Sequence, residues 1–150
     1  MKAVIQRVSE ASVTIENEKV ANIGAGLLIL IGIEEADTTE DINWLVKKIA
    51  NLRIFGDENN VMNKSLLDTK GDAIIVSQFT LHASTKKGNR PSYIKAAKPT
   101  TAIPIYEAFV SEFEKTIEKR VQTGRFGADM KVALLNDGPV TIIIDTKDKK

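Results

Sequence analysis

Residues 26–33, Gly-Leu-Leu-Ile-Leu-Ile-Gly-Ile, form an unbroken apolar run that decides the fold of this chain. A short run of this kind, rich in β-branched residues, is typical of a buried strand. A second such run, Ala-Ile-Ile-Val, occupies residues 73–76. The two runs therefore predict the central strands of a β-sheet.

Four further strand-like stretches lie outward from these runs. Residues 2–8 and 11–16 alternate in the period of a strand. Two more strands, residues 131–135 and 140–145, are predicted near the end of the chain, and the Asn136-Asp137-Gly138-Pro139 stretch between them is predicted to be a turn. Together the segments predict about seven strands in a largely antiparallel or mixed sheet, or a barrel-like one.

Two amphipathic segments predict helices that cover one face of this sheet. The first starts with Asp37-Thr38-Thr39-Glu40, which resembles a capping box, and continues with apolar residues at helical spacing. The second starts near Thr101, carries Pro104 in its first turn and continues as a long apolar stripe. We expect a single α/β domain over residues 1–146 and a charged tail, residues 147–150, that frays.

The composition is that of an ordinary globular protein. Hydrophobic residues make up 43% and charged residues 27% of the 150 positions, which excludes a disordered chain. There is no Cys, so disulfides, thiolate nucleophiles and cysteine-bound metals are excluded. No apolar run approaches the length of a membrane span, and we expect a soluble, cytoplasmic protein with no membrane partner.

Positive charge is concentrated in one segment, although the net charge is only +1. The chain has no acidic residue between Asp72 and Glu107, but that interval contains Lys86, Lys87, Arg90, Lys95 and Lys98. Such a segment can bind a phosphate backbone, and it can equally be a solvated loop. The predicted loop over residues 82–100 is long for a compact domain, and long loops are usually functional or disordered.

His82 is the only histidine, which excludes most common catalytic centres. No His or Cys spacing suits a metal site and no phosphate-binding glycine loop is present, so we expect neither metal nor cofactor. Ser77 and His82 lie an odd number of residues apart, and a regular strand would point them to opposite faces rather than into a catalytic triad. We interpret His82 as a loop or surface residue without a catalytic role.

Two short polar segments remain as candidate sites. In Ser77-Gln78-Phe79-Thr80-Leu81, strand parity would place Gln78 and Thr80 on one face, where an amide and a hydroxyl could form a binding wall. The same side chains could instead satisfy neighbouring backbone groups. Residues 136–141, Asn-Asp-Gly-Pro-Val-Thr, are by themselves an ordinary connection between strands. Neither segment alone identifies a function.

Taken together, the two segments resemble the signature motifs of the D-aminoacyl-tRNA deacylase family, in the same order and at the same spacing. The resemblance covers nearly the whole chain, because it extends through residues 1–8, 51–55, 86–92 and 123–130. The chain departs from the family pattern at His82 and Ser84, where a larger apolar or aromatic residue and an acidic residue are expected. These departures concern only the rim of the expected pocket.

The resemblance implies hydrolysis of the ester between a D-amino acid and the 3′ end of tRNA. It also implies that glycyl-tRNA mischarged on tRNA-Ala is a substrate and that L-aminoacyl-tRNA is rejected. The active unit would be a homodimer in which a cis Gly138-Pro139 bond reaches into the pocket of the partner. The carbonyls of Gly138 and Pro139 would accept from the α-amino group of the substrate and exclude an L side chain, and Arg7 would hold those carbonyls in place.

The resemblance also implies roles for the remaining site residues. Gln78, Phe79 and Thr80 would form a catalytic wall whose N–H groups and hydroxyl stabilise the oxyanion. Either the Thr80 hydroxyl attacks the ester or the terminal ribose 2′-OH activates water, and we favour the second because Thr80 lacks a neighbouring base. The terminal adenosine and the tRNA backbone would be bound by Phe126, Met130, Lys86, Lys87 and Arg90.

Two other classes of function stay open. A non-catalytic RNA-binding module would use the basic loop to bind tRNA without releasing an amino acid. An editing partner would be recruited to an aminoacyl-tRNA synthetase, although this chain carries no synthetase domain. No DNA partner is expected.

Overall fold

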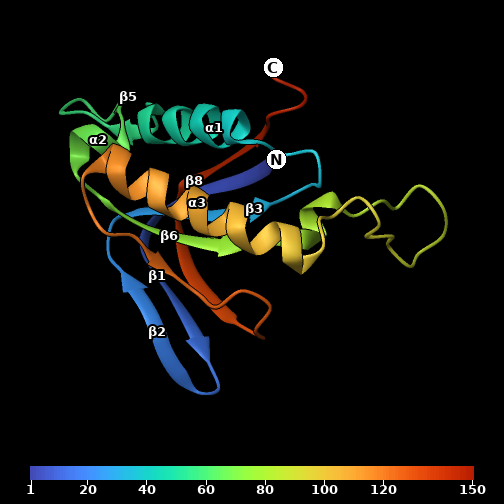
Figure 1. Cartoon of the computed structure of the whole chain (residues 1–150). Coiled ribbons are helices and arrows are strands. Elements are labelled where there is room, and N and C mark those ends of the chain that lie inside the picture. Colours follow the sequence, from blue (N-terminus) through green and yellow to red (C-terminus); the bar gives the residue numbers. More distant parts are fainter.

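A mixed β-sheet forms the centre of the molecule in the computed structural model, which describes residues 1–150 (Figure 1). Strand β1 (Lys2–Ile15) pairs antiparallel with β2 (Glu18–Ile23), β3 (Gly26–Gly32) and β8 (Lys131–Asp145). Strand β3 pairs parallel with β6 (Asp72–Ser77), and β6 pairs parallel with β7 (Gln122–Thr123). The predicted α/β class and mixed sheet are confirmed.

Two predicted interruptions of the sheet are wrong. Residues 2–15 form one strand rather than two, and residues 131–145 also form one strand. Both halves of β8 pair with the same strand β1, so the expected turn at residues 136–139 is a bulge inside a continuous strand. Long-range pairing on both sides of the bulge overrides the local preference of Asp-Gly-Pro for a turn.

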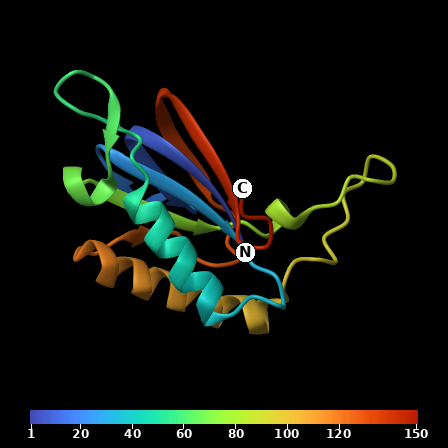
Figure 2. The ribbon, with the colours of Figure 1, turned by 90° about the horizontal axis from the view of Figure 1, so that it is seen from above.

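Two long helices cover one face of the sheet (Figure 2). Helix α1 (Thr39–Asn51) begins with a capping box between Thr38 and Asp41. Helix α3 (Pro99–Ile117) begins two residues earlier than predicted, and Pro104 therefore lies beyond its first turn. The smaller elements are α2 (Leu66–Thr69), the 3₁₀ turn η1 (Phe79–His82) and a hairpin of β4 (Phe55–Gly56) and β5 (Met62–Lys64).

The core lies mainly between the sheet and the two long helices. Its largest fully buried side chains include Phe109 and Phe113 of α3 and Ile5, Ile29 and Ile49 of the facing elements. A second apolar cluster, which includes Val13, Leu28 and Ile74, occupies the other side of the sheet. Apolar side chains on both sides of β3 and β6 explain why these strands are continuous apolar runs.

The residues after β8 contact helix α1, although the tail was expected to fray. Lys147 Nζ lies 2.9 Å from Asp41 Oδ2, and Lys149 Nζ lies 4.5 Å from the centre of the Trp44 ring. The α-amino group of Met1 lies 2.6 Å from Asp37 Oδ1 and donates to the Thr146 hydroxyl at 3.0 Å. These contacts join both ends of the chain to the start of α1.

Candidate active site

Strand β6 ends at Ser77, and the chain turns at once into η1. Gln78 N donates to Ile31 O at 2.7 Å, and the side-chain amide of Gln78 donates to the Thr80 hydroxyl. The first hydrogen bond of the turn runs from Leu81 N to Gln78 O, so the amides of Phe79 and Thr80 precede it. Gln78 and Thr80 thus meet because the backbone turns, and the strand-parity argument for this pair is wrong.

A pocket of about 280 Å³ opens beside this turn, and most of the residues that line it are hydrophobic. Its lining includes Gln78 and Phe79, together with Phe126 and Met130 from the loop before β8. Phe126 packs against Tyr106 with ring centres 6.0 Å apart, and the Tyr106 hydroxyl donates to Ile75 O at 2.6 Å. Burial raises the pKa of Tyr106 to about 12, so this hydroxyl stays protonated. The structure therefore brings four of the predicted site residues to one pocket.

His82 is buried, so its interpretation as a loop or surface residue is wrong. Only 3% of the residue is exposed, and its Nδ1 lies 3.4 Å from Glu34 Oε1. The reason is the tight turn, which folds η1 back against β3. A Cβ added at Gly32 would lie 2.9 Å from Leu81 Cβ and 3.1 Å from His82 Cδ2, so glycine permits this close approach.

The second signature segment forms the bulge of β8. Between the paired positions Asn136 and Thr141, residues 137–140 lie opposite a single residue of β1, Arg7. The Gly138-Pro139 peptide bond is cis. The φ angle of Gly138 is 133°, and a Cβ there would lie 2.9 Å from Arg7 Nη2. A side chain at position 138 would therefore strain the backbone and displace the guanidinium.

Arg7 supports the bulge at its start. Its Nε donates to Asp137 O at 3.0 Å, the carbonyl just before Gly138, and its Nη1 donates to Ile54 O at 2.7 Å. Arg7 makes no direct hydrogen bond to the carbonyl of Gly138 or Pro139, and it holds the bulge through the residue before them. Arg7 thus connects the start of the bulge to the loop that follows α1.

Asn136 closes the base of the bulge, which the sequence analysis did not predict. Its side-chain Nδ2 donates to Val140 O on the far side of the bulge and to Arg7 O across the strand pair, both at 3.0 Å. Asn136 Oδ1 accepts from the Thr141 hydroxyl at 3.4 Å. The sequence does not reveal this role, because the partners of Asn136 are backbone carbonyls.

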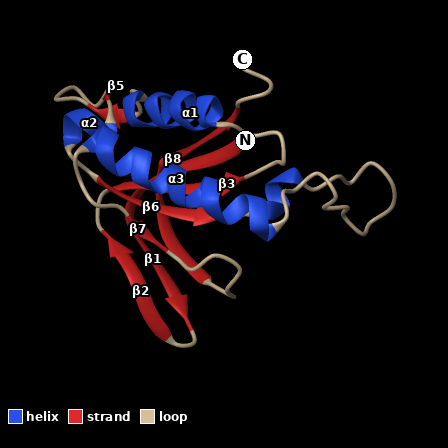
Figure 3. Ribbon diagram, viewed as in Figure 1, coloured by secondary structure: helices blue, strands red, loops and turns tan.

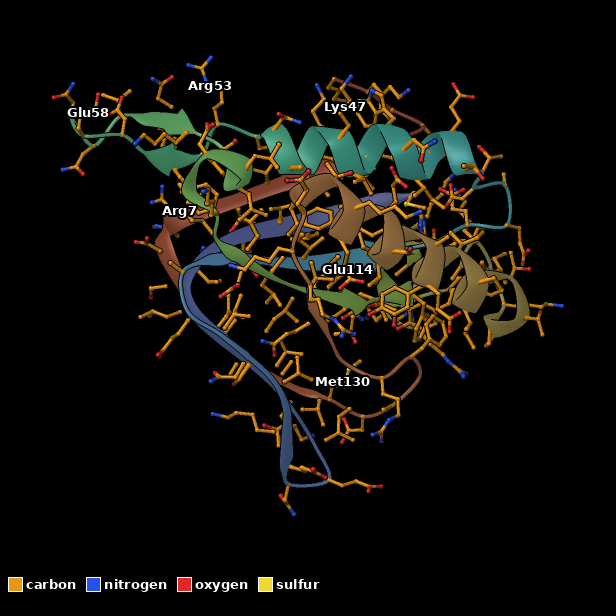
Figure 4. All side chains as sticks on the ribbon, turned by 60° about the vertical axis from the view of Figure 1, so that its left-hand side comes forward. Arg7, Lys47, Arg53, Glu58, Glu114 and Met130 are labelled. Carbon is orange, nitrogen blue, oxygen red and sulfur yellow. The ribbon has the colours of Figure 1, made fainter.

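The wall and the bulge of one chain lie apart. Gln78 is hydrogen-bonded to Ile31 of β3, and Ile31 pairs with Ala3 of β1. Asp137 is hydrogen-bonded to Arg7, which lies four residues further along β1. Four strand residues span roughly 13 Å. Figure 4 likewise shows Arg7, beside the bulge, and Met130, in the pocket, in separate regions. Gly138 and Pro139 therefore do not line the pocket of their own chain.

The predicted basic residues lie in a loop that projects from the body between η1 and α3 (Figure 3). Ser84 and Ser92 exchange backbone hydrogen bonds of 2.8 and 2.9 Å, and residues 85–91 beyond them form what we name the finger. The finger carries Lys86, Lys87 and Arg90, all exposed. They do not line the pocket.

The pocket and the bulge occur in a chain whose sequence matches a known family. A family model described as D-Tyr-tRNA(Tyr) deacylase matches residues 4–145. The chain belongs to this family. The resemblance inferred from the two signature segments is thereby confirmed.

Relatives in this family match the chain from end to end. The D-aminoacyl-tRNA deacylases of Flavobacterium johnsoniae and Bacteroides thetaiotaomicron are 67% and 63% identical to it over 100% of both chains. A solved structure named c-Myc DNA Unwinding Element Binding Protein has a TM-score of 0.92 and 42% identity over 97% of this chain and 99% of that one. A probable eukaryotic D-amino acid tRNA deacylase shares the fold, with a TM-score of 0.83 at 17% identity over 95% of this chain and 97% of that one.

No group of three or more His, Cys, Asp or Glu side chains is placed to hold a metal ion. None of the helices combines the length and the apolar character that crossing a bilayer requires.

Proposed function

We propose that this chain hydrolyses the ester of D-aminoacyl-tRNA, releasing the D-amino acid and free tRNA, in the cytoplasm. The observation that carries the proposal is the pocket shared by Gln78, Phe79, Phe126 and Met130 in a chain of the deacylase family. The aromatic ring of Phe126 and the apolar side chain of Met130 suit the base and ribose of the terminal adenosine. The ester on that ribose then lies at the wall formed by residues 78–80.

The wall suits stabilisation of the oxyanion. The amides of Phe79 and Thr80 precede the first hydrogen bond of η1 and are available to a carbonyl oxygen that gains negative charge. Gln78 donates to the Thr80 hydroxyl and orients it. Water adds to the ester carbon, the tetrahedral intermediate collapses, and the ribose 3′ oxygen leaves with a proton.

Thr80 has no base beside it that would make it a nucleophile. Its side-chain partner is the Gln78 amide, a donor that cannot accept the hydroxyl proton. We therefore assign activation of the water to the neighbouring 2′-OH of the terminal ribose. A substrate that ends in 2′-deoxyadenosine should lose most of the activity, whereas Thr80→Ser should keep most of it.

Gly138 and Pro139 supply selection against L-amino acids in this proposal. Their carbonyls accept from the α-amino group of the substrate, and the bulge leaves no space for a side chain of L configuration. Glycine, which has no side chain, passes the same filter, so glycyl-tRNA mischarged on tRNA-Ala is also a substrate. The contacts of Arg7 and Asn136 support the bulge in its observed place.

The filter and the wall come from different subunits of a homodimer. The separation of roughly 13 Å between them along β1 argues against a site within one chain. Strand β8 pairs only with β1, so its other edge is free. Its Leu135 and Ile143 are 57% and 73% exposed, which suits burial against a second copy. A two-fold axis would then make two identical sites.

The experiment that tests the function is hydrolysis of matched D- and L-tyrosyl-tRNA by purified protein. We expect release of the D-amino acid, and of glycine from glycyl-tRNA, with the L-ester nearly intact and no effect of a chelator. Equal rates for the two enantiomers would contradict the proposal. Binding of tRNA without release of an amino acid would favour the non-catalytic module. Displacement of the tRNA by DNA would indicate that this chain also binds DNA, as the name of the 42% identical relative says of that protein.

A further inference from the structure

Two exposed aromatic rings lie between the pocket and the finger. The ring of Tyr93, just after the Ser84–Ser92 bridge, meets the ring of Phe79 edge-on, with centres 5.1 Å apart and planes at 77°. Tyr93 is 41% and Phe79 is 55% exposed. We name this pair the aromatic ledge.

The ledge continues the wall of the pocket outward. Phe79 lines the pocket. Tyr93 lies on the side of Phe79 toward the finger, because it directly follows Ser92, which pairs with Ser84 at the base of that loop. Backbone bonds also hold the far end of the loop: Ala97 N donates to Ile33 O at 2.8 Å, and Lys98 N donates to Glu35 Oε1 at 2.9 Å. The ledge therefore stands on a loop anchored at both sides.

The finger beside the ledge carries positive charge that suits an anionic partner. Three exposed cations, Lys86, Lys87 and Arg90, lie in the finger, and no acidic residue occurs between Asp72 and Glu107. Exposed rings next to cations are the combination that binds single-stranded nucleic acid, because any base can stack on a ring while the cations hold phosphates.

We propose that Tyr93, supported by Phe79, stacks an unpaired nucleobase of the single-stranded 3′ end of tRNA, the one next to the terminal adenosine. This inference rests on the proposed function. The order of the surfaces matches the order of the nucleic acid: the pocket takes the terminal adenosine, the ledge takes the next base, and the finger takes phosphates beyond it. Tyr93 is thus a substrate-binding residue that acts only on substrates longer than one nucleotide.

The test compares two substrates that carry the same ester. D-tyrosyl-tRNA offers the whole 3′ end, and D-tyrosyl-adenosine ends at the first nucleotide. For Tyr93→Ala we expect KM for the tRNA to rise about tenfold more than KM for the adenosine ester, the size of one lost stacking contact. Tyr93→Phe keeps the ring and should behave as the wild type.

Ile94→Ala is the matched control, because Ile94 is the next residue, is 91% exposed and has no aromatic ring. It should leave both KM values unchanged. Lys86→Glu with Lys87→Glu should raise KM for the tRNA alone and reduce its dependence on salt. The adenosine ester also reports whether each variant folds, since its hydrolysis needs the intact pocket.

Three results would overturn the inference. If Tyr93→Ala raised KM equally for both substrates, the ring would shape the wall rather than bind a second base. If Ile94→Ala raised KM for the tRNA as much as Tyr93→Ala does, no stacking would be involved. Monomers of Tyr93→Ala in sedimentation, where the wild type is dimeric, would assign the ledge to a second copy of the chain. If the wild type cleaves neither substrate, the proposed function fails. The ledge can then still be tested by the binding of uncharged tRNA, which Tyr93→Ala should weaken about tenfold and which would be unchanged if the ledge did not bind a base.

Discussion

Asn136 and Arg7 hold the β8 bulge through backbone carbonyls rather than through other side chains. Arg7 Nε reaches Asp137 O, and Asn136 Nδ2 reaches Val140 O, so the two side chains hold the bulge at its two ends. Asn136 also reaches Arg7 O, which fixes the bulge against β1. The position of Gly138 and Pro139 therefore depends on two side chains whose hydrogen bonds go to backbone carbonyls.

We expect Asn136→Asp to weaken selection between D- and L-aminoacyl-tRNA. A carboxylate has no N–H to donate and would face two carbonyl oxygens, which removes two hydrogen bonds worth about 1 kcal/mol each. The ratio of kcat/KM for the D-ester to that for the L-ester should fall about tenfold or more. This ratio does not depend on the fraction of protein that is folded, so it separates positioning from stability.

Asn51→Asp is the control for this change. Asn51 Nδ2 donates to Lys47 O at 2.9 Å at the exposed end of α1, so the same chemical change there removes one amide-to-carbonyl bond that does not involve the bulge. Its selectivity should equal that of the wild type. An Asn136→Asp variant with unchanged selectivity would show that Arg7 alone holds the bulge.

At the scale of elements, the start of α1 is the point where several parts of the chain meet. Asp41 caps the helix through Thr38 N at 2.9 Å and pairs with Lys147 beyond β8. Burial would raise the pKa of Asp41, but hydrogen bonds from Thr146, Thr38 and Lys147 outweigh it and hold the pKa well below its usual range. The charged carboxylate therefore stabilises the folded state.

We expect Asp41→Asn to lower the free energy of unfolding by about 1–2 kcal/mol at pH 7. The folded-state pKa lies below the unfolded one, so the stabilisation is complete above the unfolded pKa of about 4 and is lost as the pH falls toward the folded pKa. Urea unfolding at several pH values should show the two proteins converging at acid pH. Glu40→Gln, in the same turn but exposed, should change little, and a constant gap across pH would contradict the assignment.

Elements that depend on local pattern could be predicted from the sequence, and those that depend on distant partners could not. The apolar runs of β3 and β6 and the stripes of α1 and α3 are each visible within one segment. The continuity of β8 across its bulge is visible only beside β1. The burial of His82 has the same origin, because it depends on the close approach of η1 to Gly32.

At the scale of the whole molecule, the two signature segments lie at separate places on one chain. The resemblance identified both segments, and the pocket contains Gln78, Phe79, Phe126 and Met130 together. Composition and periodicity could not supply the distance from this pocket to Gly138, because that distance depends on the register of β1 against β3 and β8. In the proposed homodimer, a second copy brings its bulge to the wall of the first.

Mixing two inactive variants tests this arrangement. Thr80→Arg blocks the wall beside Gln78, and Gly138→Ala forces a Cβ to within 2.9 Å of Arg7 Nη2 and Val140 Cγ2, which displaces the filter. Each variant alone should be inactive on D-tyrosyl-tRNA. In a mixed dimer one site combines both lesions, whereas the other combines an intact wall with an intact filter. Random mixing of equal amounts should therefore restore about a quarter of the wild-type activity, because half of the dimers carry one intact site of two.

The restored activity should still reject L-tyrosyl-tRNA, since the intact site contains an unaltered filter. Refolding the variants together and verifying mixed dimers with two different affinity tags provides the necessary control. If mixed dimers form and the mixture stays inactive, wall and filter must act within one chain, and β8 would have to move along β1 by roughly 13 Å, the offset along that strand between Ala3 and Arg7. Such a shift would break the strand pairing on both sides of the bulge, whereas a two-fold partner needs none of it.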